Sequence, residues 1–273
     1  MRRLLIPLLL LITAPWGNAQ APALPTLQKI AQTATINLGH RESSVPFSYY
    51  DARRQVVGYS HDLMLRAVDG IQAELKLPAL AVKLVPVTSQ NRIPLVQNGS
   101  VDLECGSTTH NRERARQAGF SVSIFQTSSR LLTRRGSGVA ELADLKGRRV
   151  AVTAGTTSER SLLLHSESTG VRFDIVTVKD HGDGFNRVQE GRAEAFLMDE
   201  AMLYGLRVKA DRPDDWRVVG QPMAAEVYAC MLRKDDPRFK ALVDRSLTEL
   251  MQSGAGQLRL SPLGGIGDWN QRR

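Results

Sequence analysis

Three features that would indicate other classes of protein are absent from this sequence. After residue 21 no apolar run is long enough to cross a bilayer, which argues against a membrane-spanning protein. No cysteine follows the first apolar run, so a lipid anchor is not indicated. No basic run is interleaved with aromatic residues, although the formal net charge is +8, so nucleic acid is not expected as a partner. The dispersed charge is more typical of solubility or of contact with anionic surfaces.

The residues that are present fit an exported globular protein. The 273 residues are 42% hydrophobic, enough for one large or two modest α/β domains. Residues 1–21 begin with Arg2 and Arg3, continue with an apolar run from Leu4 to Ala14, and end in small residues. This pattern is typical of a cleaved secretory signal peptide, the alternative being a buried N-terminal helix. We expect a soluble, exported protein without a cofactor or a metal site.

Strand-like and helix-like patterns alternate along the rest of the chain. Ser60 is a candidate N-cap because apolar residues follow it at helical spacing, and Asp236 is the expected cap of a helix at 237–252. The expected strands are 35–38, 81–87, 101–105, 148–153, 173–178, 193–198 and 226–232, and the remaining expected helices are 92–99, one opening at Thr156, and 183–190.

Such alternation indicates an α/β fold of mixed, mostly parallel sheets covered by helices. Two series of this kind are separated by the extended segment 128–138 and rejoin near Glu226, so we expect two lobes with the chain crossing between them. Cys105 and Cys230 both lie in apolar strands. The sequence is equally compatible with a disulfide and with two free thiols.

Polar side chains follow the predicted strands at their carboxyl ends, where open α/β sheets bind ligands. They are Arg41, Ser89, Arg92, Ser107, Thr109, Thr156, Thr157, His181 and Asp199, with Arg114 a few residues further on. The arginines carry planar donor forks suited to carboxylates. Three guanidinium groups in one cleft would repel one another, so a ligand with two carboxylates would satisfy most of their charge, and Asp199 could neutralise an ammonium group. Hydroxyl groups and the helix start in "AGTTSE" would add further hydrogen bonds.

Each of these residues also has a purely structural interpretation. Thr156 with Glu159 fits a capping box, and any single arginine is more often solvated or ion-paired at the surface. His181 fits a satisfied loop histidine, or an acid/base pair with Glu42 or Asp183 in an exported enzyme. Only the joint placement at strand ends favours a ligand site.

The strings "HRESSVPFSYYD", "SQNRIPL" and "ECGSTT" closely resemble those of the periplasmic glutamate/aspartate-binding proteins of ABC-type importers, within the larger family of polar amino acid binding proteins. The resemblance runs from about residue 27 to 254. It implies a two-lobed receptor that closes about a hinge, with one lobe from residues 22–128 and 225–273 and the other from 129–224. The implied ligands are L-glutamate and L-aspartate, and the implied partners are the permease subunits of the importer. The protein itself would be a monomer and not an enzyme.

The resemblance also implies a role for each polar residue. The side-chain carboxylate of the ligand would face Arg41, Ser89, Arg92, Thr157 and His181, the α-carboxylate would face Arg114, Thr109 and the region of Thr157, and the ammonium would face Asp199 and the region of Ser107. Residues 253–273 depart from the family pattern because they are rich in glycine and lack an amphipathic period, so a disordered or truncated tail is expected. The second alternative, a sensing module of a signalling receptor, would need a membrane span and an output domain, and we expect neither.

Overall fold

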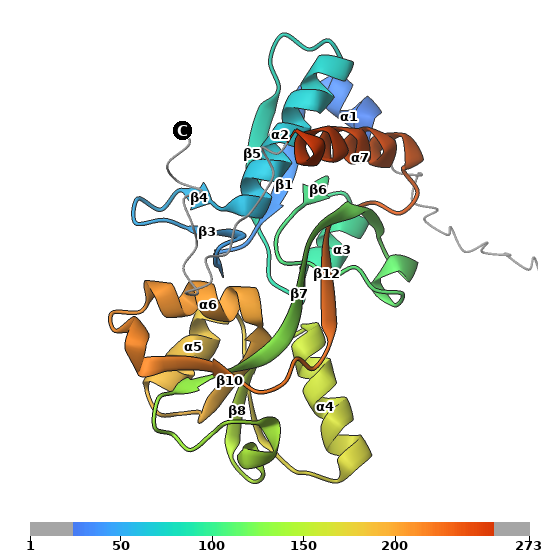
Figure 1. The fold of residues 1–273 in the computed structure, drawn as a ribbon. Helices are drawn as coiled ribbons and strands as arrows, with labels where there is room; N and C mark the ends of the chain where they lie inside the picture. Colours follow the sequence, from blue (N-terminus) through green and yellow to red (C-terminus); the bar gives the residue numbers. More distant parts are fainter. Residues whose placement is uncertain (1–23, 254–273) are drawn as a thin grey trace, which may run out of the picture.

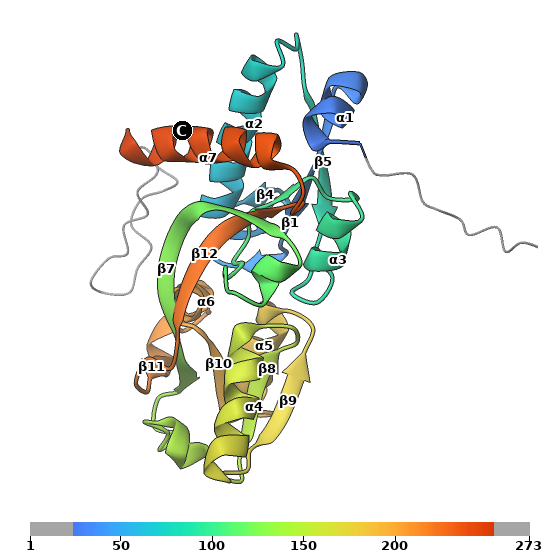
Figure 2. The same cartoon turned by 90° about the vertical axis from the view of Figure 1, so that its right-hand side faces the viewer.

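The computed structural model describes residues 24–253. The predicted signal peptide therefore lies outside the described residues, as does all of the predicted tail except Ser253. The described chain folds into two lobes, each an α/β layer structure, joined by two strands that run side by side (Figures 1 and 2). Within residues 24–253 no helix is long and apolar enough to cross a membrane.

The first lobe, uppermost in Figure 1, is built on parallel strands. Its elements are α1 (Thr26–Thr33), β1 (Thr35–His40), α2 (Tyr59–Glu74), β5 (Ala81–Pro86), α3 (Arg92–Gln97), β6 (Leu103–Glu104), the 3-10 helix η1 (Arg114–Arg116) and α7 (Pro237–Gln252). The sheet runs in the order β5–β1–β6, and α7 packs against α2. A separate small sheet is formed by β2 (Ser43–Ser44), β3 (Ser48–Tyr50) and β4 (Val56–Val57).

The second lobe has the same layered construction. Its elements are the 3-10 helix η2 (Leu142–Leu145), β8 (Arg149–Thr153), α4 (Thr157–Thr169), β9 (Asp174–Val178), α5 (His181–Gln189), β10 (Ala195–Asp199), α6 (Glu200–Lys209), the 3-10 helix η3 (Pro213–Asp215) and β11 (Trp216–Val219). Strands β10, β8 and β9 are parallel. The predicted alternation of strands and helices is therefore confirmed in both lobes.

The lobes are connected by β7 (Gly119–Arg134) and β12 (Ala225–Leu232). Up to Ser128, β7 pairs antiparallel with β12, which itself pairs with β6. From Ser129 onward, β7 pairs instead with β10, and further along also with β11. One strand thus belongs to the sheets of both lobes, and it changes partner between two consecutive residues.

The capping predictions are partly right. Asp236 caps α7 by accepting from the Phe239 N–H, and Thr156 caps α4 by accepting from the Glu159 N–H. Ser60 is not a cap, because α2 begins one residue earlier and its N-cap is Gly58. Gly58 has φ +126°, and a Cβ there would lie 2.6 Å from the carbonyl oxygen of Phe47, so the chain enters α2 through a position that only glycine fits.

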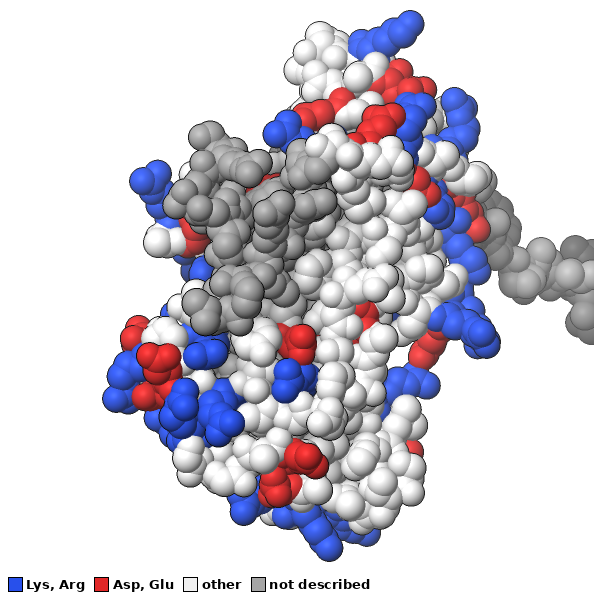
Figure 3. All heavy atoms as spheres, in the orientation of Figure 1, with Lys and Arg blue, Asp and Glu red and all other residues white. Residues whose placement is uncertain are grey.

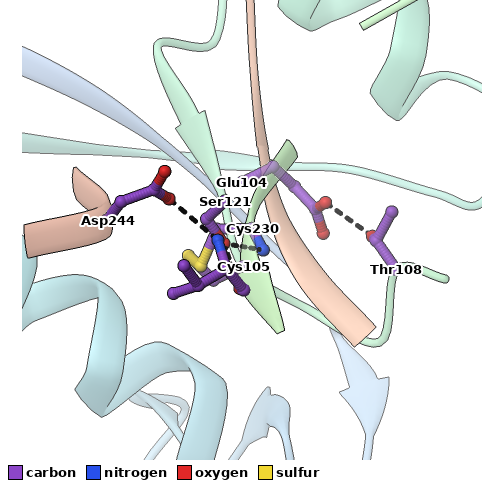
Figure 4. Close-up of a disulfide and its surroundings, with 7 residues drawn as sticks. Glu104, Cys105, Thr108, Ser121, Cys230 and Asp244 are labelled. Carbon is purple, nitrogen blue, oxygen red and sulfur yellow. Dashed lines mark hydrogen bonds between the residues drawn. A yellow bond between two sulfur atoms is a disulfide. The ribbon is translucent and has the colours of Figure 1, made fainter. Parts of the chain in front are cut away.

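The cores lie between the sheets and their helices. The largest cluster is lined in the first lobe by residues such as Ile36, Leu38 and Met64, all fully buried. Cys105 and Cys230 are joined by a disulfide in this core, with an S–S distance of 2.05 Å (Figure 4). The alternative of two free thiols is thereby excluded, and the end of β6 is bonded covalently to β12.

Candidate functional site

The polar residues predicted at strand ends are brought to the facing ends of the two lobes. Arg41 directly follows β1, and Arg92 begins the helix that comes after β5. On the second lobe Thr157 begins α4 after β8, His181 begins α5 after β9, and Asp199 is the last residue of β10. The prediction that these groups lie at carboxyl ends is confirmed, and nearly all of them are buried.

Arg41 and Arg92 carry donors without protein partners. Both side chains are at most 2% exposed. Among the described residues, nothing accepts a hydrogen bond from Nε and Nη1 of Arg41 or from Nε of Arg92. The Ser89 hydroxyl and the Nε2 atom of His181 are likewise buried without a described partner. Unpaired buried donors are costly, so this group has the chemistry of an anion site.

His181 is held as a neutral imidazole. Burial, followed by the positive charges of Arg41 and Arg92, lowers the pKa of His181 to about 3, although Asp180 acts in the opposite direction. Its Nδ1 lies 2.9 Å from the Thr153 hydroxyl. A neutral imidazole offers one donor and one acceptor, so at neutral pH His181 can hydrogen-bond a ligand carboxylate without adding a full charge.

Arg114 reaches from the first lobe to the second. Its Nη1 donates to the carbonyl oxygen of Thr109 at 3.0 Å, and its Nη2 donates to the carbonyl oxygen of Gly155 at 3.1 Å. Burial lowers the pKa of Arg114, and the negative charge of Glu226 is the largest effect that raises it. The guanidinium is thus held by one backbone oxygen from each lobe.

Asp199 is the centre of a hydroxyl network. Its Oδ1 accepts from Ser129 at 3.1 Å and from Ser158 at 3.4 Å, and its Oδ2 accepts from the Tyr228 hydroxyl. Burial and the charge of Glu226 raise the pKa of Asp199 to about 7, even though the three hydroxyls act to lower it. A buried carboxylate of this kind is suited to receive a cation such as an ammonium group.

Three acids near the arginines were missed in the sequence. Glu104 and Glu226 are buried in strands, and Asp180 lies 3.4 Å from Arg41 Nη2. The expectation that a ligand would satisfy most of the charge of the three guanidinium groups is therefore wrong, because carboxylates of the protein act on all three arginines. The signal that could have found two of them is an acid inside an otherwise apolar strand: "VDLEC" contains Asp102 and Glu104, and "EVYACML" contains Glu226 alone.

Other predicted residues are placed less directly. The Thr109 hydroxyl donates to Glu226 Oε2 at 2.5 Å, so its hydrogen is already used within the protein. The Ser107 hydroxyl donates to the Ser44 hydroxyl at 3.3 Å. Thr157 is half-buried, and it lies at the N-terminus of α4, where backbone N–H groups are free of helical partners.

The capping box predicted at Thr156 and Glu159 is only half formed. The Thr156 hydroxyl accepts from the Glu159 N–H at 3.1 Å, whereas the Glu159 carboxylate accepts from the Gly155 N–H and not from that of Thr156. The acid/base pairs considered for an enzyme do not form in the described part of the chain, where neither Glu42 nor Asp183 hydrogen-bonds to His181. Residues 24–253 also contain no group of three His, Cys, Asp or Glu side chains that could hold a metal ion.

Several contacts cross between the lobes close to the site. Besides Arg41 with Asp180 and Arg114 with Gly155, the Ser43 hydroxyl accepts from the Gly182 N–H at 2.9 Å. On the face shown in Figure 3, basic and acidic side chains lie mostly along the margins, and a largely uncharged region lies between them. The charged groups of the site, in contrast, are buried.

Known proteins are similar to this chain over most of its length. Residues 36–258 match the family described as bacterial extracellular solute-binding proteins, family 3. The chain is 52% identical over 240 residues to a glutamate/aspartate import solute-binding protein of Escherichia coli (strain K12), covering 88% of this chain and 80% of that protein. It is 50% identical over 230 residues to an L-glutamate/L-aspartate-binding protein of Pseudomonas aeruginosa, covering 84% and 76%.

Solved structures are similar in fold. An ancestral arginine-binding protein bound to glutamine superposes with a TM-score of 0.73 at 23% sequence identity, covering 82% of this chain and 94% of the other. This likeness confirms the predicted two-lobed α/β fold. The resemblance to glutamate/aspartate-binding proteins is confirmed by the sequence relatives, which are binding proteins and not enzymes.

Proposed function

Because the chain belongs to the bacterial extracellular solute-binding proteins of family 3, we propose that it binds L-glutamate and L-aspartate outside the cytoplasm. We further propose that it delivers them to the permease subunits of an ABC importer. One observation carries the ligand assignment, namely that buried polar atoms of Arg41, Ser89, Arg92 and His181 lack partners among the described residues. A carboxylate is an acceptor-only group of matching chemistry.

In this proposal the side-chain carboxylate of the ligand is held by Arg41, Ser89, Arg92 and His181, with Thr157 at the helix N-terminus. The α-carboxylate is held by Arg114 from the first lobe and by the N-terminal N–H groups of α4. Support comes from the position of Arg114, whose guanidinium already reaches Gly155 immediately before that helix. Thr109 contributes by placing Arg114 through its carbonyl oxygen as much as by direct contact.

The ammonium group is proposed to meet Asp199, with the carbonyl and hydroxyl oxygens near Ser107 as further acceptors. Among the described residues Asp199 accepts hydrogen bonds from three hydroxyl groups, which hold its carboxylate in place in the site. Glutamine is expected to bind far more weakly than glutamate, because its neutral amide cannot pair with the guanidinium groups of Arg41 and Arg92.

Binding is proposed to proceed by closure of a hinge. The lobe boundaries in this proposal are 22–128 and 225–273 for the first lobe and 129–224 for the second. They are supported by the change of partner along β7 between Ser128 and Ser129. Removal of the signal peptide at residues 1–21, a periplasmic location and a monomeric state belong to the same proposal.

Isothermal titration calorimetry with a panel of amino acids tests the ligand assignment. We expect glutamate and aspartate to bind and glutamine to bind at least tenfold more weakly. Arg114→Ala should remove binding, since an unpaired buried charge costs roughly 3 to 5 kcal/mol. The matched control is Arg112→Ala, which removes an exposed arginine two residues away and should bind as the wild type does. Binding of neutral amino acids in preference to acidic ones would refute the proposal.

A further inference from the structure

Thr108 is fully buried, and it lies between Ser107 and Thr109, both of which have a role in the proposed ligand site. Thr108 itself has no role in that site so far. Its hydroxyl oxygen accepts a hydrogen bond from Arg92 Nη1 at 2.6 Å and donates one to Glu104 Oε2, also at 2.6 Å. Figure 4 shows the second of these bonds beside the disulfide. A hydroxyl has a single hydrogen, so donation to Glu104 turns the oxygen lone pairs toward Arg92.

The acceptor of that hydrogen is held in a fixed place. Glu104 is fully buried in β6, where it pairs with Met231 of β12, and the next residue forms the disulfide between Cys105 and Cys230. A Cβ at Gly106 would lie 2.6 Å from Glu104 Oε1, so a glycine at this position leaves room for the carboxylate. Backbone pairing, a covalent bond and close packing therefore all restrict Glu104.

The contacts of Arg92 divide its guanidinium into two parts. Nη1 is occupied by Thr108 and, at 3.3 Å, by the carbonyl oxygen of Ser107. Nε has no hydrogen-bond partner in the described chain. Nη1 is thus hydrogen-bonded within the protein, whereas Nε is available to an acceptor that the described residues do not supply. A hydroxyl that donates to a carboxylate is also polarised into a better acceptor, which strengthens the hold on Nη1.

The neighbouring threonine is arranged differently. The Thr109 hydroxyl also donates to a buried glutamate, Glu226, but Arg114 is bound by the Thr109 carbonyl oxygen and not by its hydroxyl. Removal of the Thr109 hydroxyl would leave the backbone acceptor of Arg114 in place. Removal of the Thr108 hydroxyl would take away the shorter of the two hydrogen bonds that hold Arg92.

We propose that Thr108, oriented by Glu104, is the positioning residue of Arg92 and thereby sets the affinity for the ligand carboxylate that Arg92 binds. The inference rests on the proposed function for the identity of that carboxylate. It predicts that the hydroxyl at position 108 matters for binding although it does not itself contact the ligand.

Three variants test the inference. Thr108→Val removes the hydroxyl and keeps the shape, and Thr108→Ser restores the hydroxyl. Thr133→Val is the matched control, because Thr133 is 1% exposed and its hydroxyl also makes two hydrogen bonds, to Ser137 and to the Glu194 carbonyl oxygen, within the second lobe. We expect Thr108→Val to raise the Kd for glutamate about tenfold or more, Thr108→Ser to stay within about threefold of the wild type, and Thr133→Val to leave Kd unchanged.

A second measurement shows whether the Arg92 guanidinium rotates freely in the unliganded protein. In nitrogen-15 NMR spectra, with the Arg92 signals assigned from an Arg92→Lys variant, a held guanidinium gives separate Nη signals and a freely rotating one gives a merged signal. We expect separate signals in the wild type, Thr108→Ser and Thr133→Val, and a merged signal in Thr108→Val. Separate signals in Thr108→Val, or an unchanged Kd in that variant, would overturn the inference. If the wild type bound no acidic amino acid, the proposed function would fail, and the NMR comparison would still decide whether Thr108 holds Arg92.

Discussion

The carboxyl groups of Asp199 and Glu226 lie 3.1 and 3.5 Å from the same hydroxyl oxygen, that of Ser129. Ser129 is also the residue at which β7 begins to pair with β10. Two buried carboxylates that share one donor cannot both ionise freely, and burial together with the charge of Glu226 raises the pKa of Asp199 to about 7. In the proposed complex the ligand ammonium would compete with a proton at this position.

Glutamate binding is therefore expected to release a proton near pH 6. Because the pKa of Asp199 is about 7 without ligand, affinity should rise with pH by up to about tenfold per unit below pH 7 and level off above it. Calorimetry in two buffers of different ionisation enthalpy measures the release directly. The same titrations at pH 8.5, where Asp199 is already ionised, should show almost none. Equal proton release at both pH values would contradict the assignment of the ammonium to Asp199.

The stability of the unliganded protein should depend on two opposing titrations. The pKa of Asp199 is raised from 3.8 to about 7, so the folded state holds a proton that the unfolded chain has lost, and stability falls as pH rises across that range. The pKa of His181 is lowered from 6.5 to about 3, so the unfolded chain binds the extra proton and stability rises with pH over that range.

Variants separate these two contributions. Between pH 4.5 and 6.5, His181→Gln should become less stable with rising pH and Asp199→Asn more stable, each by up to about 1.4 kcal/mol per pH unit. Urea unfolding at several pH values measures both slopes. Slopes of the same sign in the two variants would show that one of the two groups is not buried in the charge state described.

Replacing Glu104 should destabilise the protein much more than replacing an acid in a partly exposed ion pair. Burial lowers the pKa of Arg92 to about 9, and the negative charge of Glu104 opposes that shift. Glu104→Gln removes this charge, and a loss of about 3 kcal/mol in unfolding free energy is expected. The matched control is Glu194→Gln, whose partner Arg149 is 43% exposed and where the expected loss is below about 1 kcal/mol. Denaturant unfolding of both variants checks this, and equal losses would argue against a role for Glu104 as counter-ion.

A methyl group at position 205 should oppose closure of the lobes. A Cβ on Gly205 of α6 would lie 2.7 Å from the carbonyl oxygen of Val45 in the first lobe. Gly205→Ala should weaken glutamate binding about tenfold, because the added methyl group would keep α6 and the Val45 segment from approaching as closely as they do in this structure. Calorimetry measures the affinity, and small-angle scattering with saturating glutamate should give a larger radius than for the wild type. Unchanged affinity would mean that α6 and the Val45 segment need not approach each other.

Much of this architecture is predictable from local patterns. The strands and helices follow from apolar periodicity. The positions of Arg41, His181 and Asp199 at strand ends are predictable as well, because the carboxyl ends of parallel strands meet at one edge of a sheet. Glu104 and Glu226 could not be placed in this way. A carboxylate in a strand normally indicates a solvent-facing position. Only the tertiary structure shows that the buried hydroxyls of Thr108 and Thr109 donate to these two carboxylates.

The disulfide and the contacts between the lobes also could not be predicted from the sequence. Cys105 and Cys230 are 125 residues apart, and nothing in their flanking residues distinguishes a bonded pair from two packed thiols. The pairing of Arg41 with Asp180 depends on how one lobe approaches the other, which no local pattern encodes. The charge balance of the site was misjudged for this reason.

Strand β7 also limits how the protein can be divided. A cut between residues 128 and 129 would fall inside a single 16-residue strand. Each fragment would then end in a part of β7 that is no longer continuous with the rest of the strand. Fragments made at that point would expose open sheet edges and be prone to aggregate when produced separately. Fusions or split reporters built on this scaffold should therefore be opened in surface turns such as the one at Gly136 and not at the crossing itself.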